Sequence, residues 1–137
     1  MSLRTVTLLA VATSAVAAFV SIDRGLPADF AGILDGDSGN VLGEFLLWRG
    51  TAIAPPLPLI MTMAVLAFFV PQHRVATGLL TAIGAGGVVG YLGEPQTWNA
   101  HALYTPLVLV SLALFASVAA LGAGELRGGP AARTVAV

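Results

Sequence analysis

Long uncharged stretches are the feature that most constrains how this chain can fold. Four of them separate the charged residues, and they contain 18, 24, 19 and 30 residues, at positions 5–22, 50–73, 75–93 and 95–124. A helix needs roughly 20 apolar residues to cross roughly 30 Å of bilayer hydrocarbon. The pattern therefore predicts an all-α integral membrane protein, folded as a single four-transmembrane-helix bundle over residues 1–127.

Composition excludes several other classes of protein. Hydrophobic residues make up 57% of the chain and charged residues 9%, which leaves too little polar surface for a soluble globule. Six arginines, no lysine and a net charge of −1 provide no basic patch for nucleic acid. Without cysteine there are no disulfides and no Cys-ligated metals, and we predict neither a cofactor nor a bound metal. Arginine in place of lysine, with abundant Ala, Gly and Val, is typical of a bacterial protein, so we expect a multi-pass protein of the bacterial inner (cytoplasmic) membrane.

Charge placement gives the predicted bundle an orientation. The predicted spans cover residues 4–22, 41–70, 75–93 and 102–123, with residues 23–40 as an outer loop or lid and residues 128–137 as a disordered tail. Most arginines fall on one side of this arrangement: Arg4, Arg74, Arg127 and Arg133. Because cytoplasmic segments are enriched in Arg and Lys, both termini are predicted to lie in the cytoplasm.

The first span also resembles an export signal, with a small-residue cleavage site at residues 15–17. Its apolar run continues through Ile22, which is longer than a typical signal core. A retained first helix is therefore the favoured interpretation.

Three prolines, all within Pro55-Pro56-Leu57-Pro58, interrupt the second span. Each lacks a backbone N–H, and proline disfavours the helical conformation of the residue before it. We predict a helix that begins near Val41, with Asn40 or Ser38 as its cap. It is kinked or broken at the prolines, near Ala54-Pro55.

Such a break exposes backbone carbonyl groups. Those of Thr51, Ala52 and Ala54 lose their helical partners four residues on. They would accept hydrogen bonds from water, a guanidinium, a hydroxyl ligand or a cation, and broken helices of this kind often line transporter sites. The favoured interpretation is a structural kink whose carbonyls are satisfied by neighbouring Ser, Thr and water.

Small residues mark two faces of the third span. Gly86 and Gly90, four residues apart, lie on one face, and Gly84, Gly87 and Tyr91 lie on another. Small residues let helix backbones approach closely in membranes. We therefore predict a central packing helix, with the Gly86 and Gly90 face as a surface for a homo-oligomer.

Reactive side chains converge on the predicted outer end of the bundle. The catalytic candidates are Glu44, Arg49, Glu94 and His101. The predicted ligand-binding residues around them are Asp23, Trp48, Thr51, Tyr91, Trp98, Asn99 and Tyr104. Carboxylates, an imidazole and a guanidinium at a partly dry interface are suited to acid and base chemistry on a lipophilic substrate. The structural alternative is that these charges end helices at the interface, with Glu44 paired to Arg49 or Arg24.

Two more specific sites are excluded by spacing. His73 and His101 are separated by the whole third span, so they cannot ligate one haem together. Residues 35–40 begin like a calcium loop, but its twelfth position is Leu46 instead of the bidentate Glu. A turn that caps the next helix is favoured there.

Three functions fit this sequence. The first is a small membrane protein that binds a lipophilic small molecule in a polar pocket at the outer end, or that acts as accessory subunit of a membrane complex. The second is a membrane-embedded enzyme with hydrolase or isomerase chemistry, supported by the converging polar side chains. The third is a small transporter or channel, which rests on the proline break. The expected partners are the lipid bilayer and either a lipophilic molecule or another membrane protein, and not nucleic acid.

Overall fold

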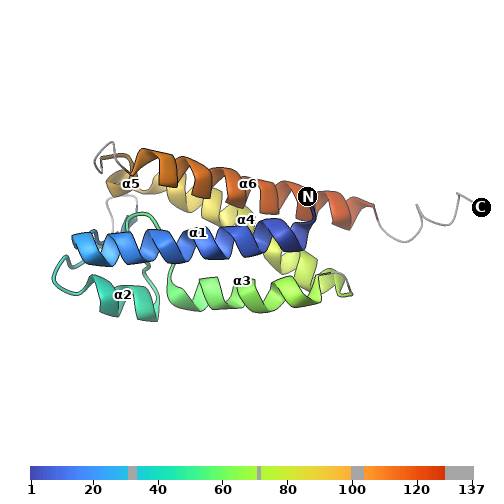
Figure 1. Cartoon of the computed structure of the whole chain (residues 1–137), viewed down its shortest axis with the longest axis horizontal. Coiled ribbons are helices and arrows are strands. Elements are labelled where there is room, and N and C mark those ends of the chain that lie inside the picture. Colours follow the sequence, from blue (N-terminus) through green and yellow to red (C-terminus); the bar gives the residue numbers. More distant parts are fainter. Residues whose placement is uncertain (31–33, 71, 100–103, 129–137) are drawn as a thin grey trace, which may run out of the picture.

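Helices lying side by side form the body of the molecule in the computed structural model, which describes residues 1–30, 34–70, 72–99 and 104–128 (Figure 1). The bundle helices are α1 (Leu3–Arg24), α3 (Leu57–Phe69), α4 (Arg74–Gly93) and α6 (Thr105–Arg127). Shorter elements lie at one end: α2 (Val41–Leu47), α5 (Pro95–Asn99), β1 (Asp29–Phe30) and β2 (Leu34–Asp35). We call this end, residues 25–30, 34–56 and 94–99, the cap.

Within the described residues, three helices are long and apolar enough to cross a membrane. The α1, α4 and α6 helices contain 22, 20 and 23 residues, and at about 1.5 Å per residue each is roughly 30–35 Å long. Large apolar side chains such as Phe19, Val89 and Leu109 are exposed on them. An extensive exposed apolar surface of this kind is typical of contact with lipid. The structure thus supports a helical membrane protein, while α3, with 13 residues, is too short to span by itself.

Among the bundle helices, α4 and α6 pack against each other most extensively. Glycines let their backbones approach: a side-chain carbon on Gly84 would lie 2.7 Å from the backbone nitrogen of Ala119. One face of α4 also carries Tyr91, whose ring centroid lies 5.8 Å from that of Phe115 on α6. The predicted packing face at Gly84 and Tyr91 therefore contacts α6.

The second predicted span, residues 41–70, leaves the helical conformation well before its prolines. The α2 helix starts where predicted but ends at Leu47, and α3 begins only at Leu57. Between them Gly50 has a φ of +81°, which favours glycine, and a side chain there would lie 2.6 Å from the carbonyl oxygen of Ala54. The predicted continuation of one helix to a kink after Ala54 is therefore wrong. Residues 48–56, which we call the linker, separate two helices.

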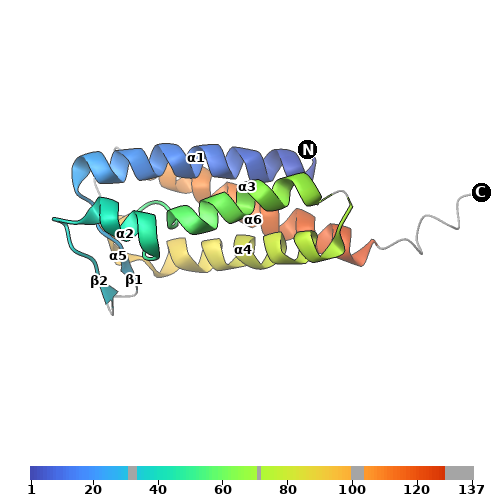
Figure 2. The same ribbon diagram turned by 90° about the horizontal axis from the view of Figure 1, so that it is seen from below.

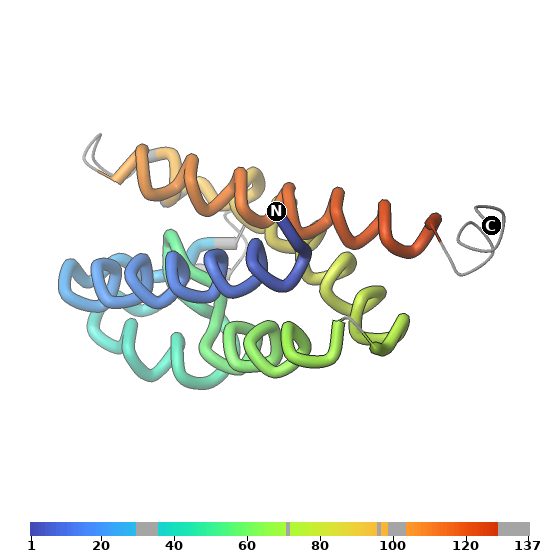
Figure 3. Tube along the Cα trace, turned by 45° about the vertical axis from the view of Figure 1, so that its right-hand side comes forward, coloured from blue at the N-terminus to red at the C-terminus, as the bar shows by residue number. Residues whose placement is uncertain are grey.

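The start of α1 and the end of α6 lie at the same end of the bundle, opposite the cap (Figure 1). At that end Arg74 Nη2 donates a hydrogen bond to the Leu126 carbonyl oxygen at 2.6 Å, which ties α4 to α6. The α2 and α3 helices follow one another alongside α1 (Figure 2). Figure 3 shows α3 and α6 on opposite sides of α1. The four bundle helices therefore run together between the cap and the end that holds the start of α1 and the end of α6.

The predicted outer loop, residues 23–40, belongs largely to the cap. Where the structure describes it, β1 pairs with β2 in antiparallel register, with Asp29 opposite Asp35. Residues 31–33 of this loop and the predicted tail after Gly128 lie outside the described residues.

Candidate binding cavity

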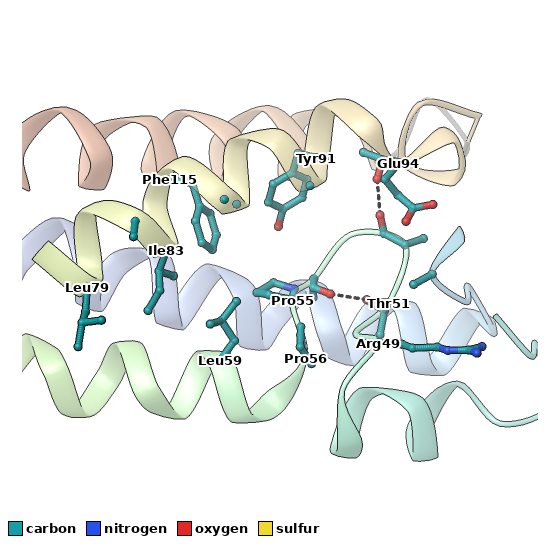
Figure 4. Close-up of a pocket in the computed structure, with 18 residues that line it drawn as sticks. Arg49, Thr51, Pro55, Pro56, Leu59, Leu79, Ile83, Tyr91, Glu94 and Phe115 are labelled. Carbon is teal, nitrogen blue, oxygen red and sulfur yellow. Dashed lines mark hydrogen bonds between the residues drawn. The ribbon is translucent and has the colours of Figure 1, made fainter. Parts of the chain in front are cut away.

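A cavity of about 490 Å³ lies between α3 and α4, beneath the linker (Figure 4). Its walls are mainly apolar and include Leu59 on α3, Leu79 and Ile83 on α4, and Phe115 on α6. The polar lining residues are at the cap end: Arg49, Thr51, Tyr91, Glu94 and Thr97. Small-molecule sites typically enclose about 300–1,000 Å³. The cavity is therefore large enough for a ligand, and its two ends differ in polarity.

Glycine creates much of this space. A side-chain carbon built on Gly86 or Gly90 would meet no described atom within 4 Å, although both residues line the cavity. The lining extends along α4 from Leu79 to Glu94, which is roughly 22 Å at about 1.5 Å per residue. These two glycines were predicted to form an oligomer surface. Within the single chain they leave room beside α3.

Hydrogen bonds hold the linker over the cavity. The Tyr91 hydroxyl donates to the carbonyl of Ile53 at 2.8 Å, and the Thr97 hydroxyl donates to the carbonyl of Ala52. The Ala54 carbonyl accepts from the backbone N–H of Thr51 at 2.8 Å. Backbone groups that lack water need such internal partners.

The carbonyls of Thr51, Ala52 and Ala54 therefore each accept a hydrogen bond from within the chain, so the break does not leave them without partners as the prediction assumed. The Thr51 carbonyl accepts a hydrogen bond from the N–H of Ala54 at 3.4 Å. The backbone N–H of Ala52 is also bonded, and donates to the carbonyl oxygen of Leu26 at 3.3 Å. The favoured prediction, in which neighbouring hydroxyl groups satisfy the break, describes this arrangement better. A cation site built from these carbonyls has no support in the structure.

Glu94 anchors the cap at the polar end of the cavity. Glu94 is only 6% exposed, and both of its carboxylate oxygens accept from the backbone N–H of Asp29, at 2.9 and 3.0 Å. A charged acceptor makes such bonds stronger than neutral pairs. Just beyond Glu94, the indole N–H of Trp98 donates to the Tyr91 carbonyl at 2.9 Å and holds α5 against the end of α4. Glu94 thus links α4 to the start of β1.

Glu44 and Arg49 form an ion pair beside this end. Arg49 Nη1 lies 2.9 Å from Glu44 Oε1, and the same oxygen accepts from the backbone N–H of Asp37 at 3.2 Å. The guanidinium carbon lies 5.1 Å from the Trp48 ring centroid. In Figure 4 the guanidinium is directed away from Tyr91, although Arg49 lines the cavity. Glu44 is therefore bound to its neighbours in the manner of the structural alternative.

The structure brings some of the predicted site residues together and separates others. Those that line the cavity are Arg49, Thr51, Tyr91 and Glu94. Trp48 and Trp98 are 62% and 46% exposed and do not line the cavity. Asp23 is also exposed, and its Oδ2 atom lies 3.3 Å from Arg24 Nε. Tyr104 is half-buried against the core. His101 and the side chain of Asn99 lie outside the described residues.

Several cavity residues were not identified from the sequence. Thr97 was missed because a single threonine in a polar connection carries no pattern. The apolar wall residues Leu59, Ile83 and Phe115 look like any other residues of a membrane helix. The spacing of Gly86 and Gly90 was a sequence signal for the cavity, since small residues that face no partner helix leave space beside their own helix.

No metal site is evident in the described ranges: they contain no group of three His, Asp or Glu side chains placed to hold a metal ion. Comparisons of the chain with protein-family models, with curated proteins and with solved structures find no match. A proposal for function therefore rests on the cavity and on the groups at its two ends.

Proposed function

We propose that this protein binds a lipophilic small molecule in the cavity between α3 and α4. The observation that carries the proposal is the open space beside Gly86 and Gly90, which apolar walls enclose on other sides. Apolar cavities with a few polar groups at one end are typical of small-molecule sites. A molecule with a hydrocarbon body and a polar head matches this distribution.

The exposure of the α4 wall of the cavity supports entry of a ligand from the membrane. Leu79 is 49% exposed on α4, and Ala82 and Gly86 next to it along the lining are also exposed. These residues lie in the middle of a helix long enough to span the bilayer. A ligand dissolved in lipid would reach the cavity between α3 and α4 without passing through water.

We further propose four membrane crossings with both termini in the cytoplasm of a bacterial inner membrane. The α1, α4 and α6 helices make three crossings, and the linker with α3 makes the fourth. Arg4, Arg74 and Arg127 belong to the helix ends opposite the cap, as the positive-inside rule expects of a cytoplasmic side. In this arrangement the cap faces the outer surface.

An enzyme is the second candidate, because Arg49 and the buried Glu94 both reach the same cavity. Against it, both oxygens of Glu94 already accept hydrogen bonds from the backbone, and Glu44 is paired with Arg49. Carboxylates in these roles stabilise the cap. Hydrolase or isomerase chemistry therefore has less support than binding.

The molecule that copurifies with the protein tests the proposal. Protein extracted from bacterial membranes in mild detergent is analysed by native mass spectrometry, followed by organic extraction and identification of any bound molecule. We expect one lipophilic molecule per chain. A second protein chain with no small molecule would favour the accessory-subunit role instead and would contradict ligand binding.

A further inference from the structure

We infer that α2 lies inside the outer leaflet of the membrane, where its exposed side chains contact lipid acyl chains. The residues that make this contact, which we call the α2 patch, are Leu42, Leu46, Leu47 and Trp48. The inference rests on the four crossings proposed above, and it extends to α2 the crossing that α3 and the linker make. It is independent of which molecule occupies the cavity.

The exposed surface changes from polar to apolar where α2 begins. Residues 37–40 are all exposed, and they are Asp, Ser, Gly and Asn. From Val41 to Arg49 the exposed residues are those of the α2 patch, with exposed fractions between 48% and 70%. A helix that faces water carries polar residues on its exposed side. The exposed side of α2 is instead that of a lipid-facing helix, and the change places the edge of the hydrocarbon near Asn40.

The α1 helix shows the same change at the same end of the bundle. Its exposed residues Val16 and Phe19 are apolar, whereas the exposed residues that follow, Asp23 and Arg24, are charged. Because α1 is long enough to span the membrane, this change marks where α1 leaves the hydrocarbon. The α2 helix contacts α1 and lies beside its cap end (Figure 1, Figure 2). It therefore lies at the depth of the outer leaflet.

The length of α3 leaves a gap that α2 fills. The 13 residues of α3 cover about 20 Å of the bilayer and the 7 residues of α2 cover about 10 Å, at about 1.5 Å per residue. Since the two helices follow one another alongside α1, together they cover roughly 30 Å, which is the thickness of the hydrocarbon. The exposed residues Met61, Val65 and Phe68 make the outside of α3 apolar as well. The α2 patch thus continues an apolar exterior that begins on α3.

The charged residues of this segment are shielded from lipid. Glu44 and Arg49 form an ion pair at 2.9 Å, and their side chains are only 11% and 27% exposed. Ionisable groups at membrane depth are costly unless they are paired and face the protein. The pair therefore lets α2 enter the membrane although it carries a carboxylate.

Tryptophan fluorescence tests the depth of α2, because the chain has two tryptophans, Trp48 in the patch and Trp98 in α5. The full chain with Trp98→Phe is reconstituted in phosphatidylcholine vesicles with or without bromine on the acyl chains. Bromine quenches tryptophans that contact lipid chains, and iodide added to the water quenches those that contact water. In two standards Trp48 is also replaced by Phe. A new tryptophan is then placed on the exposed side of α1, Phe19→Trp, or in the polar turn before α2, Ser38→Trp.

We expect brominated lipid to lower the emission of Trp48 at least twofold, as for Phe19→Trp, and iodide to quench Ser38→Trp severalfold more strongly than Trp48. If Trp98→Phe fails to fold, wild type compared with Trp48→Phe gives the emission of Trp48 by difference. A Trp48 that iodide quenches, or that neither agent quenches because a second chain covers it, would overturn the inference and leave the crossing of α1 intact. A Phe19→Trp that brominated lipid does not quench would instead contradict the crossing of α1, and with it the topology on which the inference rests.

Discussion

The hydroxyl of Tyr91 donates a hydrogen bond to the carbonyl oxygen of Ile53 at 2.8 Å, and so joins α4 to the linker above the cavity. Both residues are buried. A buried backbone carbonyl needs a hydrogen-bond donor within the protein. The Tyr91 hydroxyl is such a donor, and its bond connects the stability of the linker to a wall of the cavity.

Removing that hydroxyl should loosen the linker. Tyr91→Phe leaves the Ile53 carbonyl buried without its donor, which we expect to lower the free energy of unfolding by about 1–3 kcal/mol. Denaturant unfolding in mild detergent measures the change. Tyr104→Phe is the control, because no hydrogen bond of the Tyr104 hydroxyl to the described residues is present, and a loss of equal size in both variants would contradict the role given to Tyr91.

The Glu94 carboxylate should protect the start of β1 from exchange with solvent. In Glu94→Ala the backbone N–H of Asp29 loses both acceptor oxygens. We expect its amide to exchange at least tenfold faster, equivalent to about 1.4 kcal/mol of protection. Hydrogen exchange followed by mass spectrometry reports this, with Glu125→Ala as a control at an exposed carboxylate. Unchanged exchange at Asp29 in Glu94→Ala would show that Glu94 does not anchor the cap.

Two glycines of α4 should respond oppositely to the same substitution. An added methyl at Gly84 would meet the backbone of α6 at 2.7 Å, so Gly84→Ala should cost about 1–3 kcal/mol through overpacking. The methyl group added in Gly86→Ala would point into open space, so this substitution should be neutral or stabilise the helix by up to about 1 kcal/mol. Thermal unfolding of the two variants side by side tests this difference. Equal destabilisation would mean that Gly86 also faces a packed surface.

Membrane topology can be measured cleanly because the chain has no cysteine. Single cysteines at Ser2, Asp37 and Gly128 are labelled in intact cells with a reagent that does not cross the inner membrane. We expect labelling at Asp37→Cys only, with Ser2→Cys and Gly128→Cys reacting after the cells are broken. Labelling of Ser2→Cys and Gly128→Cys from opposite sides would contradict an even number of crossings.

Length and charge were enough to predict the long helices, because hydrocarbon thickness imposes a minimum apolar run that few other constraints can produce. The prolines indicated an interruption of the second span near Ala54-Pro55, but not that α3 begins as a separate helix at Leu57. The end of α2 was missed, because Gly50 at a φ of +81° and the turn from Thr51 to Ala54 depend on tertiary partners in α4 and α5. Those partners are far away in the sequence.

The cavity was harder to predict than the helices. Arg49, Thr51, Tyr91 and Glu94 were among the candidates, because charges and aromatic residues at helix ends stand out in an apolar chain. Their bonding partners did not stand out, since a backbone N–H such as that of Asp29 carries no sequence signal. The empty side of Gly86 could not be distinguished from a packing face, because both require small residues.

The most direct test of the central claim is the small-molecule occupancy of Gly86→Leu. Wild type, Gly86→Leu and the matched control Gly78→Leu are purified in the same mild detergent, checked for equal helicity by circular dichroism, and compared by native mass spectrometry. We predict a bound lipophile in wild type and in Gly78→Leu, and its loss from Gly86→Leu. An equally occupied Gly86→Leu, or a wild type that retains no small molecule, would contradict a ligand site between α3 and α4.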